Sequence, residues 1–253
     1  MALLDVSHLS IQFGGVKAVQ DVSFSIDAGI VYAVIGPNGA GKTTLFNLIT
    51  GIYTPTQGEI RLNGEPIHGL APDTLARRGM ARTFQNLQIC MNMLAIENVM
   101  VGAHLQLDRN LFKAAVRWPA LARRDHQLRE QAAEWMRFVG LDAYLDARAD
   151  SMPYGALKRL EIARALAMQP KLIFLDEPAA GLNPKETQEV DALVRKVADA
   201  GVTVVLVEHD MKMVMNLSDR ILVLDYGKKL AEGDRDAIRR NPEVIAAYLG
   251  AHA

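Results

Sequence analysis

The stretch Gly36-Pro37-Asn38-Gly39-Ala40-Gly41-Lys42-Thr43-Thr44 follows the apolar run Val31-Tyr32-Ala33-Val34-Ile35. Its three glycines let the backbone curl so that N–H groups point at phosphate oxygens, and the positive end of a helix starting near Lys42 adds to the attraction. We expect Lys42 to meet the β- and γ-phosphates of a nucleotide and the Thr43 hydroxyl to bind the metal. The stretch therefore predicts a nucleoside triphosphate site.

A second apolar run, Leu172-Ile173-Phe174-Leu175, ends in Asp176 and Glu177. A carboxylate on a rigid strand can hold Mg²⁺ or a water molecule beside a triphosphate, so the two stretches together predict ATP-type chemistry with magnesium. The alternatives are a glycine-rich turn for the first stretch and a strand end that happens to be acidic for the second. The spacing and flanks of the first stretch argue against the plain turn.

Composition sets limits on the other classes of function. The chain has 253 residues, half of them apolar, and a formal net charge of −1, which favours neither nucleic-acid binding nor an acidic tail. The longest apolar runs, such as 202–207, are far below the ~20 residues of a membrane helix, and Asp5 interrupts any signal-peptide core. We therefore expect a soluble, cytoplasmic protein, with Cys90 as a buried, reduced thiol.

The order of the predicted elements indicates an α/β fold. Residues 3–35 are typical of antiparallel strands and tight turns, and Glu59-Ile60-Arg61-Leu62 before Asn63-Gly64 predicts a hairpin of the same sheet. Residues 95–145 have helical periodicity and suggest a helical insertion. Helices and strands then alternate, which predicts parallel strands; the expected elements are helices 157–168, 184–200 and 211–217, strands 171–175, 202–207 and 220–224, and short terminal helices within 235–249.

One helix start is especially well marked. Asn183 suits the N-cap, Pro184 the first helical position, and Glu186 completes a capping box. Gly201 fits the other end of the same helix.

Between the two phosphate-site motifs lies Met152-Pro153-Tyr154-Gly155-Ala156-Leu157-Lys158-Arg159-Leu160-Glu161-Ile162-Ala163-Arg164-Ala165-Leu166, which resembles the signature helix of ATP-binding-cassette (ABC) proteins. Phe13, Gln85, the D-loop-like Ala180-Gly181-Leu182-Asn183 and His209 match the same family in the same order. The resemblance implies a P-loop NTPase (RecA-like) core with an N-terminal antiparallel β subdomain and a helical subdomain. We expect a single domain over 1–253, divided into 1–85 (antiparallel β and phosphate loop), 86–155 (helical) and 156–253 (rest of the core and terminal helices).

Within that family, the chain is most similar to the LivG-like importer ATPases for branched-chain or other hydrophobic amino acids. Three stretches carry the similarity: 82–85, 175–187 and the tail 241–250. The signature departs from the usual pattern at Pro153 and Ala156.

The resemblance also implies roles for individual residues. Phe13 would stack on the adenine, unless it is a core residue of the first sheet. Gln85 and Asp176 would hold Mg²⁺, and Glu177 would be the general base for the attacking water, with a structural ion pair as its alternative. His209 would donate to the γ-phosphate, although a lone histidine is often structural.

Partners follow from the same resemblance. Tyr154 and Gly155 would cover the nucleotide held by Lys42 of a second ABC ATPase subunit, identical or related. The lack of a membrane span then requires separate permease subunits, contacted around 86–98, with a solute-binding protein acting indirectly and the ATPase peripheral on the inner face of the membrane. A basic set is most simply a solvated helical face, or else contacts a membrane partner or lipid head groups: Arg109, Lys113, Arg117, Arg123, Arg124 and Arg129.

Three other classes stay open at this point. A lipid or lipopolysaccharide exporter ATPase shares the cassette but generally lacks so long a helical stretch. A non-transport cassette acting on nucleic acid usually carries a fused second module, which is absent here, so no nucleic acid is expected. An ordinary P-loop kinase has no use for a signature helix.

Overall fold

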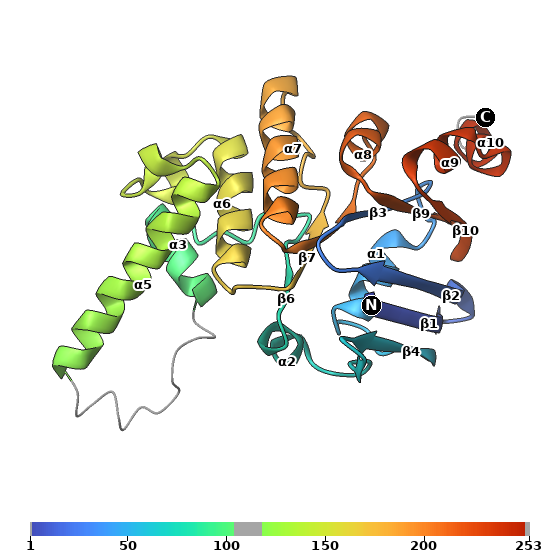
Figure 1. Cartoon of the computed structure of the whole chain (residues 1–253), viewed down its shortest axis with the longest axis horizontal. Coiled ribbons are helices and arrows are strands. Elements are labelled where there is room, and N and C mark those ends of the chain that lie inside the picture. The colour runs from blue at the N-terminus through green and yellow to red at the C-terminus, as the bar shows by residue number, and fades with distance from the viewer. Residues whose placement is uncertain (1, 104–117, 251–253) are drawn as a thin grey trace.

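The computed structural model describes residues 2–103 and 118–250, and its centre is a six-stranded sheet (Figure 1). The strand order is β10-β9-β3-β8-β7-β6, and all neighbours are parallel except the β9–β10 pair. In that order the strands are β10 (Lys228–Gly233), β9 (Arg220–Asp225), β3 (Val31–Ile35), β8 (Thr203–Val207), β7 (Leu172–Asp176) and β6 (Met80–Arg82). The parallel sheet predicted from the alternating helices and strands is therefore confirmed.

A second sheet is antiparallel and has the order β2-β1-β4-β5. Its strands are β1 (Ala2–Phe13), β2 (Val16–Asp27), β4 (Gln57–Leu62) and β5 (Glu65–Pro66). Asn63 and Gly64 both have positive φ, at 51° and 80°, as a tight hairpin turn requires. The hairpin predicted at this point is confirmed.

The prediction that 3–35 is antiparallel throughout is wrong for its last strand. Val31–Ile35 pairs in parallel with β8 and β9 and belongs to the central sheet. All five of its residues are buried, because both faces of the central sheet are covered. The polar alternation of β1 and β2, by contrast, belongs to a sheet with one face in solvent.

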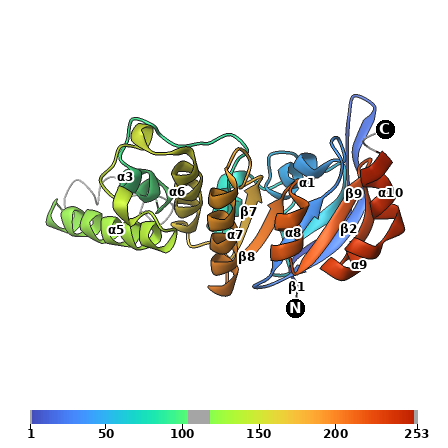
Figure 2. The same cartoon turned by 90° about the horizontal axis from the view of Figure 1, so that it is seen from above.

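The central sheet separates two hydrophobic cores. Val31, Ala33 and Ile35 point into one core, together with the helices that follow β7 and β8, whereas Tyr32 and Val34 point into the other. The second core lies between the sheet, helix α1 (Lys42–Ile49) and the antiparallel strands. In Figure 2 the helices α7 and α8 lie on one face of the central sheet and α1 on the other. The central sheet is therefore packed against other elements on both of its faces.

The helices predicted within and after the signature stretch are confirmed, with shifted ends. They are α6 (Tyr154–Leu166), α7 (Pro184–Asp199), α8 (Met211–Leu217), α9 (Arg235–Arg240) and α10 (Pro242–Gly250). At the start of α7 the Asn183 Oδ1 accepts from the N–H groups of Lys185 and Glu186, each at 3.0 Å, and Glu186 Oε2 accepts from the Asn183 N–H at 3.1 Å. The predicted capping box is therefore present. Among the described elements, α2 (Pro72–Arg77), β6, β10 and the short turn Ala149–Ser151 were not predicted.

A helical part extends from one side of the molecule (Figures 1 and 2). It contains α3 (Ala95–Gly102), α5 (Trp118–Phe138) and the short turns Asp142–Tyr144 and Ala149–Ser151. Both α3 and α5 pack on α6. The expected helix over 95–145 is thus observed where it is described. Arg109, Lys113, Arg117 and the side chain of Arg123 lie outside the described part, while Arg129 pairs with Asp146 at 2.7 Å.

The expectation of a buried Cys90 is wrong, because Cys90 is exposed and free. It lies in the loop between β6 and α3, where the buried Asn98 side chain binds its backbone on both sides. The Asn98 Oδ1 accepts from the Cys90 N–H at 2.8 Å, and the Asn98 Nδ2 donates to the Cys90 carbonyl at 3.1 Å. Asn98 therefore holds the backbone of the loop at Cys90, which itself stays exposed. No helix within 2–103 and 118–250 combines the length and hydropathy needed to cross a bilayer.

Candidate functional site: a phosphate-binding pocket

Three loops meet at the carboxyl-end edge of the central sheet, where α/β folds bind ligands. They follow β3, β7 and β8, which are neighbours in the order β3-β8-β7. Together with two turns of the β-strands they enclose a pocket of about 510 Å³. The residues lining it are Val16, Lys17, Ala18, Gln20, Asn38, Gly39, Ala40, Gly41, Lys42, Thr43, Thr44, Gln85, Glu177, His209, Tyr226 and Gly227.

The loop after β3 needs glycine at two positions for steric reasons. A Cβ on Gly36, which has φ 151°, would lie 2.1 Å from the Leu224 carbonyl oxygen. A Cβ on Gly41, which has φ 100°, would lie 2.5 Å from the Ala18 carbonyl oxygen. The loop is therefore held tightly between the end of β9 and the start of β2, and its backbone faces the pocket.

Lys42 is buried at the first turn of α1. Its Nζ donates to the carbonyl oxygens of Gly36 and Pro37, at 2.7 and 3.0 Å. Burial lowers the pKa of Lys42, and the nearby carboxylates of Glu177 and Asp176 counteract that effect. The ammonium group is thus held against the loop, close to both carboxylates that follow β7.

Glu177 lies at the centre of a three-residue cluster. Its Oε1 is 2.8 Å from His209 Nε2, and its Oε2 accepts a hydrogen bond from Gln85 Nε2 at 3.0 Å. Since a carboxylate only accepts, the His209 Nε2 carries the proton in this contact. The three side chains come from loops far apart in the chain, and all three line the pocket. The structure therefore brings together the predicted residues Gln85, Glu177 and His209 with the glycine loop.

Asp176, the residue before Glu177, is buried and pairs with Arg82. The Arg82 guanidinium lies 3.1 Å from Asp176 Oδ2 and also donates to Asn47 Oδ1 and Thr50 Oγ1, at 2.7 and 2.8 Å. Burial raises the pKa of Asp176, while Arg82 acts to lower it. Arg82 thus balances a buried charge and fixes the orientation of the carboxylate.

The residues expected to hold Mg²⁺ supply suitable atoms. Thr43 and Gln85 line the pocket, and Asp176 lies close enough to Lys42 to act on its pKa. Hydroxyl, amide and carboxylate oxygens are the ligands that Mg²⁺ prefers, and it is usually held by one or two carboxylates together with phosphate oxygens and water. In the described part of the chain no cluster of three or more His, Cys, Asp and Glu side chains forms a complete metal cage. The donor set therefore fits a magnesium ion that arrives with a phosphate ligand.

Some predicted binding residues lie outside the lining of this pocket: Gly36 and Pro37 of the glycine loop, and Phe13, Tyr154 and Gly155. Phe13 ends β1 opposite Val16, which does line it; the Phe13 ring is 43% exposed and packs edge-on against Tyr53 at 5.1 Å. The core alternative for Phe13 is thereby contradicted. Tyr154 is exposed at the start of α6. Gly155 is buried next to it, where a Cβ would lie 2.6 Å from Glu186 Oε1.

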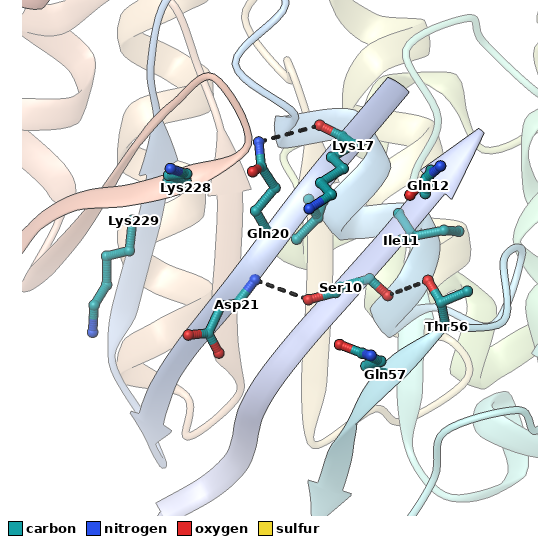
Figure 3. Close-up of a pocket in the computed structure, with 11 residues that line it drawn as sticks. Ser10, Ile11, Gln12, Lys17, Gln20, Asp21, Thr56, Gln57, Lys228 and Lys229 are labelled. Atoms are coloured by element: carbon teal, nitrogen blue, oxygen red, sulfur yellow. Dashed lines mark hydrogen bonds between the residues drawn. The ribbon is translucent and has the colours of Figure 1, made fainter. Parts of the chain in front are cut away.

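A larger hollow of about 860 Å³ lies on the antiparallel sheet, next to the pocket that the glycine loop lines (Figure 3). It shares Lys17 and Gln20 with that pocket. Its polar groups largely bind each other: the Asp21 N–H donates to Ser10 Oγ at 2.9 Å, and Thr56 Oγ1 donates to the Ser10 carbonyl at 3.0 Å. This hollow is the larger of the two, but the glycine loop and the cluster of Gln85, Glu177 and His209 line the smaller pocket.

Sequence reasoning missed several residues of the site. Arg82 lies within the quoted stretch 82–85, but nothing in the sequence indicates that its partner is Asp176. Tyr226 and Gly227 line the pocket from the β9–β10 turn, and they were missed because β10 was not predicted. Val16 and Lys17, which also line the pocket, follow the Gly14-Gly15 turn beside Phe13, and this turn was the available sequence signal for them.

Comparison with known proteins agrees with this geometry. Residues 19–180 match the family model described as ABC transporter, and residues 228–253 match the model described as branched-chain amino acid ATP-binding cassette transporter. The chain is 47% identical to the high-affinity branched-chain amino acid transport ATP-binding protein BraF of Pseudomonas aeruginosa, over 98% of each chain. It is 45% identical to the corresponding protein LivG of Escherichia coli, again over 98% of each.

Solved structures show the same fold. An ATP-binding cassette of an ABC transporter in its ADP conformation superposes with a TM-score of 0.86 at 30% identity, covering 99% of both chains. A nucleotide-free cassette gives the same TM-score and identity, over 98% of this chain and 99% of that one. The fold is thus the α/β P-loop cassette with an antiparallel subdomain, and the chain belongs to the ATP-binding-cassette family of ABC transporters, among the relatives of LivG and BraF.

Proposed function

We propose that this chain is the ATP-hydrolysing subunit of an importer for branched-chain or other hydrophobic amino acids. The observation that carries the proposal is the meeting of Lys42 and the glycine loop with Glu177, Gln85 and His209 in one pocket. The cargo is taken from LivG and BraF, whose names state branched-chain amino acid transport.

In this proposal the glycine loop, Lys42 and the Glu177 cluster each have a role in hydrolysis. Lys42 and the backbone N–H groups of the loop from Asn38 to Thr44 bind the phosphates. Glu177 accepts the proton of the attacking water through a carboxylate oxygen. His209 donates from Nε2, at present to Glu177 and then to the γ-phosphate, and Gln85 helps to orient the water. The existing contacts of Glu177 support this assignment, because they already direct its two oxygens towards the pocket.

Mg²⁺ is the metal we propose for the site, held by Thr43, Gln85 and Asp176. When bound it would neutralise charge on the phosphate oxygens. Arg82 fixes Asp176 before the metal arrives, so the chain supplies a preoriented carboxylate.

The proposed working unit is a dimer of two ABC ATPase subunits, identical or related. Tyr154 and Gly155 of one subunit would cover the nucleotide bound by Lys42 of the other, and Phe13 would stack on the adenine. The exposure of Tyr154 and Phe13 supports both roles, because both rings are available for contact. We take 1–85, 86–155 and 156–253 as the three parts of this one ATP-binding domain.

The subunit would act on the inner face of the cell membrane, bound to permease subunits and served indirectly by a solute-binding protein. The loop around 86–98 is the proposed contact, and exposed Met91 and Phe84 nearby support it. The identities with LivG and BraF favour the importer over a lipid or lipopolysaccharide exporter and over an ATPase acting on nucleic acid.

The decisive experiment is purification of the tagged chain with its membrane subunits, followed by uptake of labelled leucine into vesicles. ATP inside the vesicles should drive uptake, and the Glu177→Gln complex should not. Recovery of lipopolysaccharide-export components, or uptake that proceeds without ATP, would overturn the proposal.

A further inference from the structure

A buried carboxylate without a role so far lies next to His209. Glu208 follows the last residue of β8, and only 4% of its surface is exposed. Burial raises the pKa of this carboxyl group, the N–H groups of Ala179, His209 and Asp210 act to lower it, and the like charge of Glu177 raises it further. In the described part of the chain no cation contributes to that balance. A buried carboxyl group whose two oxygens are bound by backbone N–H groups calls for an explanation.

The two oxygens of Glu208 bind two different loops. Oε1 accepts from the Ala179 N–H at 2.9 Å, and Oε2 accepts from the N–H of His209 at 3.1 Å. Ala179 lies in the turn between β7 and α7, two residues beyond Glu177. Glu208 therefore joins the backbones of the same two turns that His209 and Glu177 join through their side chains.

The turn that contains Ala179 continues into α7 and contacts the start of α6. The Leu182 N–H donates to the Ala179 carbonyl at 3.2 Å, and Asn183 then caps α7. Between them Gly181 packs on Tyr154, since a Cβ at Gly181 would lie 3.2 Å from Tyr154 Cε1. A displacement of Ala179 would therefore also move Gly181, which packs on the exposed Tyr154 ring.

We propose that Glu208 is a positioning residue that ties the turn from Ala179 to Asn183 to His209. When His209 exchanges its contact with Glu177 for one with phosphate, Glu208 carries the movement to that turn and to Tyr154. This inference rests on the proposed roles of Glu177 and His209. A purely structural carboxylate would hold the loops together without linking their movements.

The test is a double-mutant cycle of Glu208→Gln and His209→Ala on kcat of the assembled complex. Glutamine keeps the size of the side chain but turns an NH₂ group towards a backbone N–H. If Glu208 acts through His209, Glu208→Gln lowers kcat about 10- to 100-fold, the effect of one charge-assisted hydrogen bond, and leaves the Kd for ATP nearly unchanged. In the His209→Ala background the same change then lowers kcat less than about twofold.

Asp210→Asn is the matched control. It removes one carboxylate from the same loop, but Asp210 Oδ1 accepts from the N–H groups of Lys212 and Met213 and so caps α8. Asparagine caps about as well as aspartate, so kcat should stay close to the wild-type value. Independent, multiplicative losses in the Glu208/His209 cycle would overturn the inference. An unchanged kcat in His209→Ala alone would instead refute the proposed role of His209.

A second measurement covers the case in which Glu208→Gln does not fold. Backbone hydrogen exchange in His209→Ala should be faster across 179–183 than in the wild type, because the turn loses its side-chain link to His209 and keeps only the Glu177 bond to Val207 and the Glu208 bond to Ala179. Residues 60–67 of the antiparallel sheet, where the N–H groups of Asn63 and Ile67 donate to the carbonyls of Leu3 and Ile60, serve as the internal reference. Equal exchange in 179–183 of the two proteins would contradict the link.

Discussion

His209 Nε2 lies 2.8 Å from Glu177 Oε1, although the two residues are 32 positions apart in the chain. The contact holds the carboxylate towards the pocket, where Gln85 binds its other oxygen. Glu177 itself has a positive φ of 50°, and its N–H donates to the Val207 carbonyl at 3.0 Å. The strained backbone is thus anchored to the strand that carries His209, so the position of the proposed base depends on both loops.

Glu177→Gln should keep ATP binding and slow hydrolysis by roughly 10² to 10⁴, the usual contribution of a general base. The amide has nearly the same shape but cannot take a proton from water. Phosphate release by the assembled complex measures the rate, and titration with a fluorescent ATP analogue measures binding. Unchanged turnover in this variant would remove Glu177 as the base.

Lys42→Ala should weaken ATP binding by about 10- to 100-fold, because a charge-assisted hydrogen bond to phosphate contributes about 1.5–3 kcal/mol. The fold should survive, since burial disfavours the Lys42 charge in the absence of nucleotide. The same titration, with circular dichroism as the folding control, provides the measurement. Wild-type affinity in a folded Lys42→Ala protein would contradict the phosphate-loop assignment.

Gly36→Ala should lower the free energy of unfolding by about 2–4 kcal/mol, because the new Cβ would lie within 2.1 Å of the Leu224 carbonyl oxygen. Gly39→Ala is the matched control, since no atom lies within 4 Å of its Cβ position. There only the cost of its left-handed conformation, about 1–2 kcal/mol, should appear. Urea denaturation of both variants compares the two. Equal losses would show that close packing does not explain the glycine at 36.

The buried Glu161 should make stability depend on pH. Burial raises the pKa of its carboxyl above the unfolded value, so the folded chain binds this proton more tightly. The resulting stabilisation is complete below the unfolded pKa of about 4.3 and is lost as the pH rises through the folded pKa. Glu161→Gln removes this term, so its free energy of unfolding should fall less steeply with rising pH than that of the wild type. Urea denaturation without nucleotide at a series of pH values from 5 upwards tests the slope, and parallel curves would contradict the assignment.

Several local features were predictable because the residues that decide them are close in sequence. The curl of the loop from Gly36 to Thr44 needs glycine at fixed spacings, and the start of α7 is defined within the four residues from Asn183 to Glu186. The Asn63-Gly64 hairpin is equally local. In each case the hydrogen bonds and the backbone conformations involve only a few neighbouring positions.

Long-range partners were not predictable in the same way. The strand Val31–Ile35 is apolar throughout, and its place in the central sheet depends on its pairing with Val204 in β8 and Arg220 in β9, both far along the chain. The backbone at the exposed Cys90 is bound by the side chain of Asn98, from the following helix. Periodicity describes one segment at a time, so it gave no information about either pairing.

The sequence by itself determined the phosphate loop, the acidic strand end and the alternation of helices and strands, because those depend on the geometry of contiguous residues. Only the tertiary structure decided that Arg82 balances Asp176 across 94 positions and that Glu208 joins the Ala179 turn to His209. The physical reason is that a buried charge must find compensation wherever the packed fold places a donor, and that location is set by strand order and not by spacing along the chain.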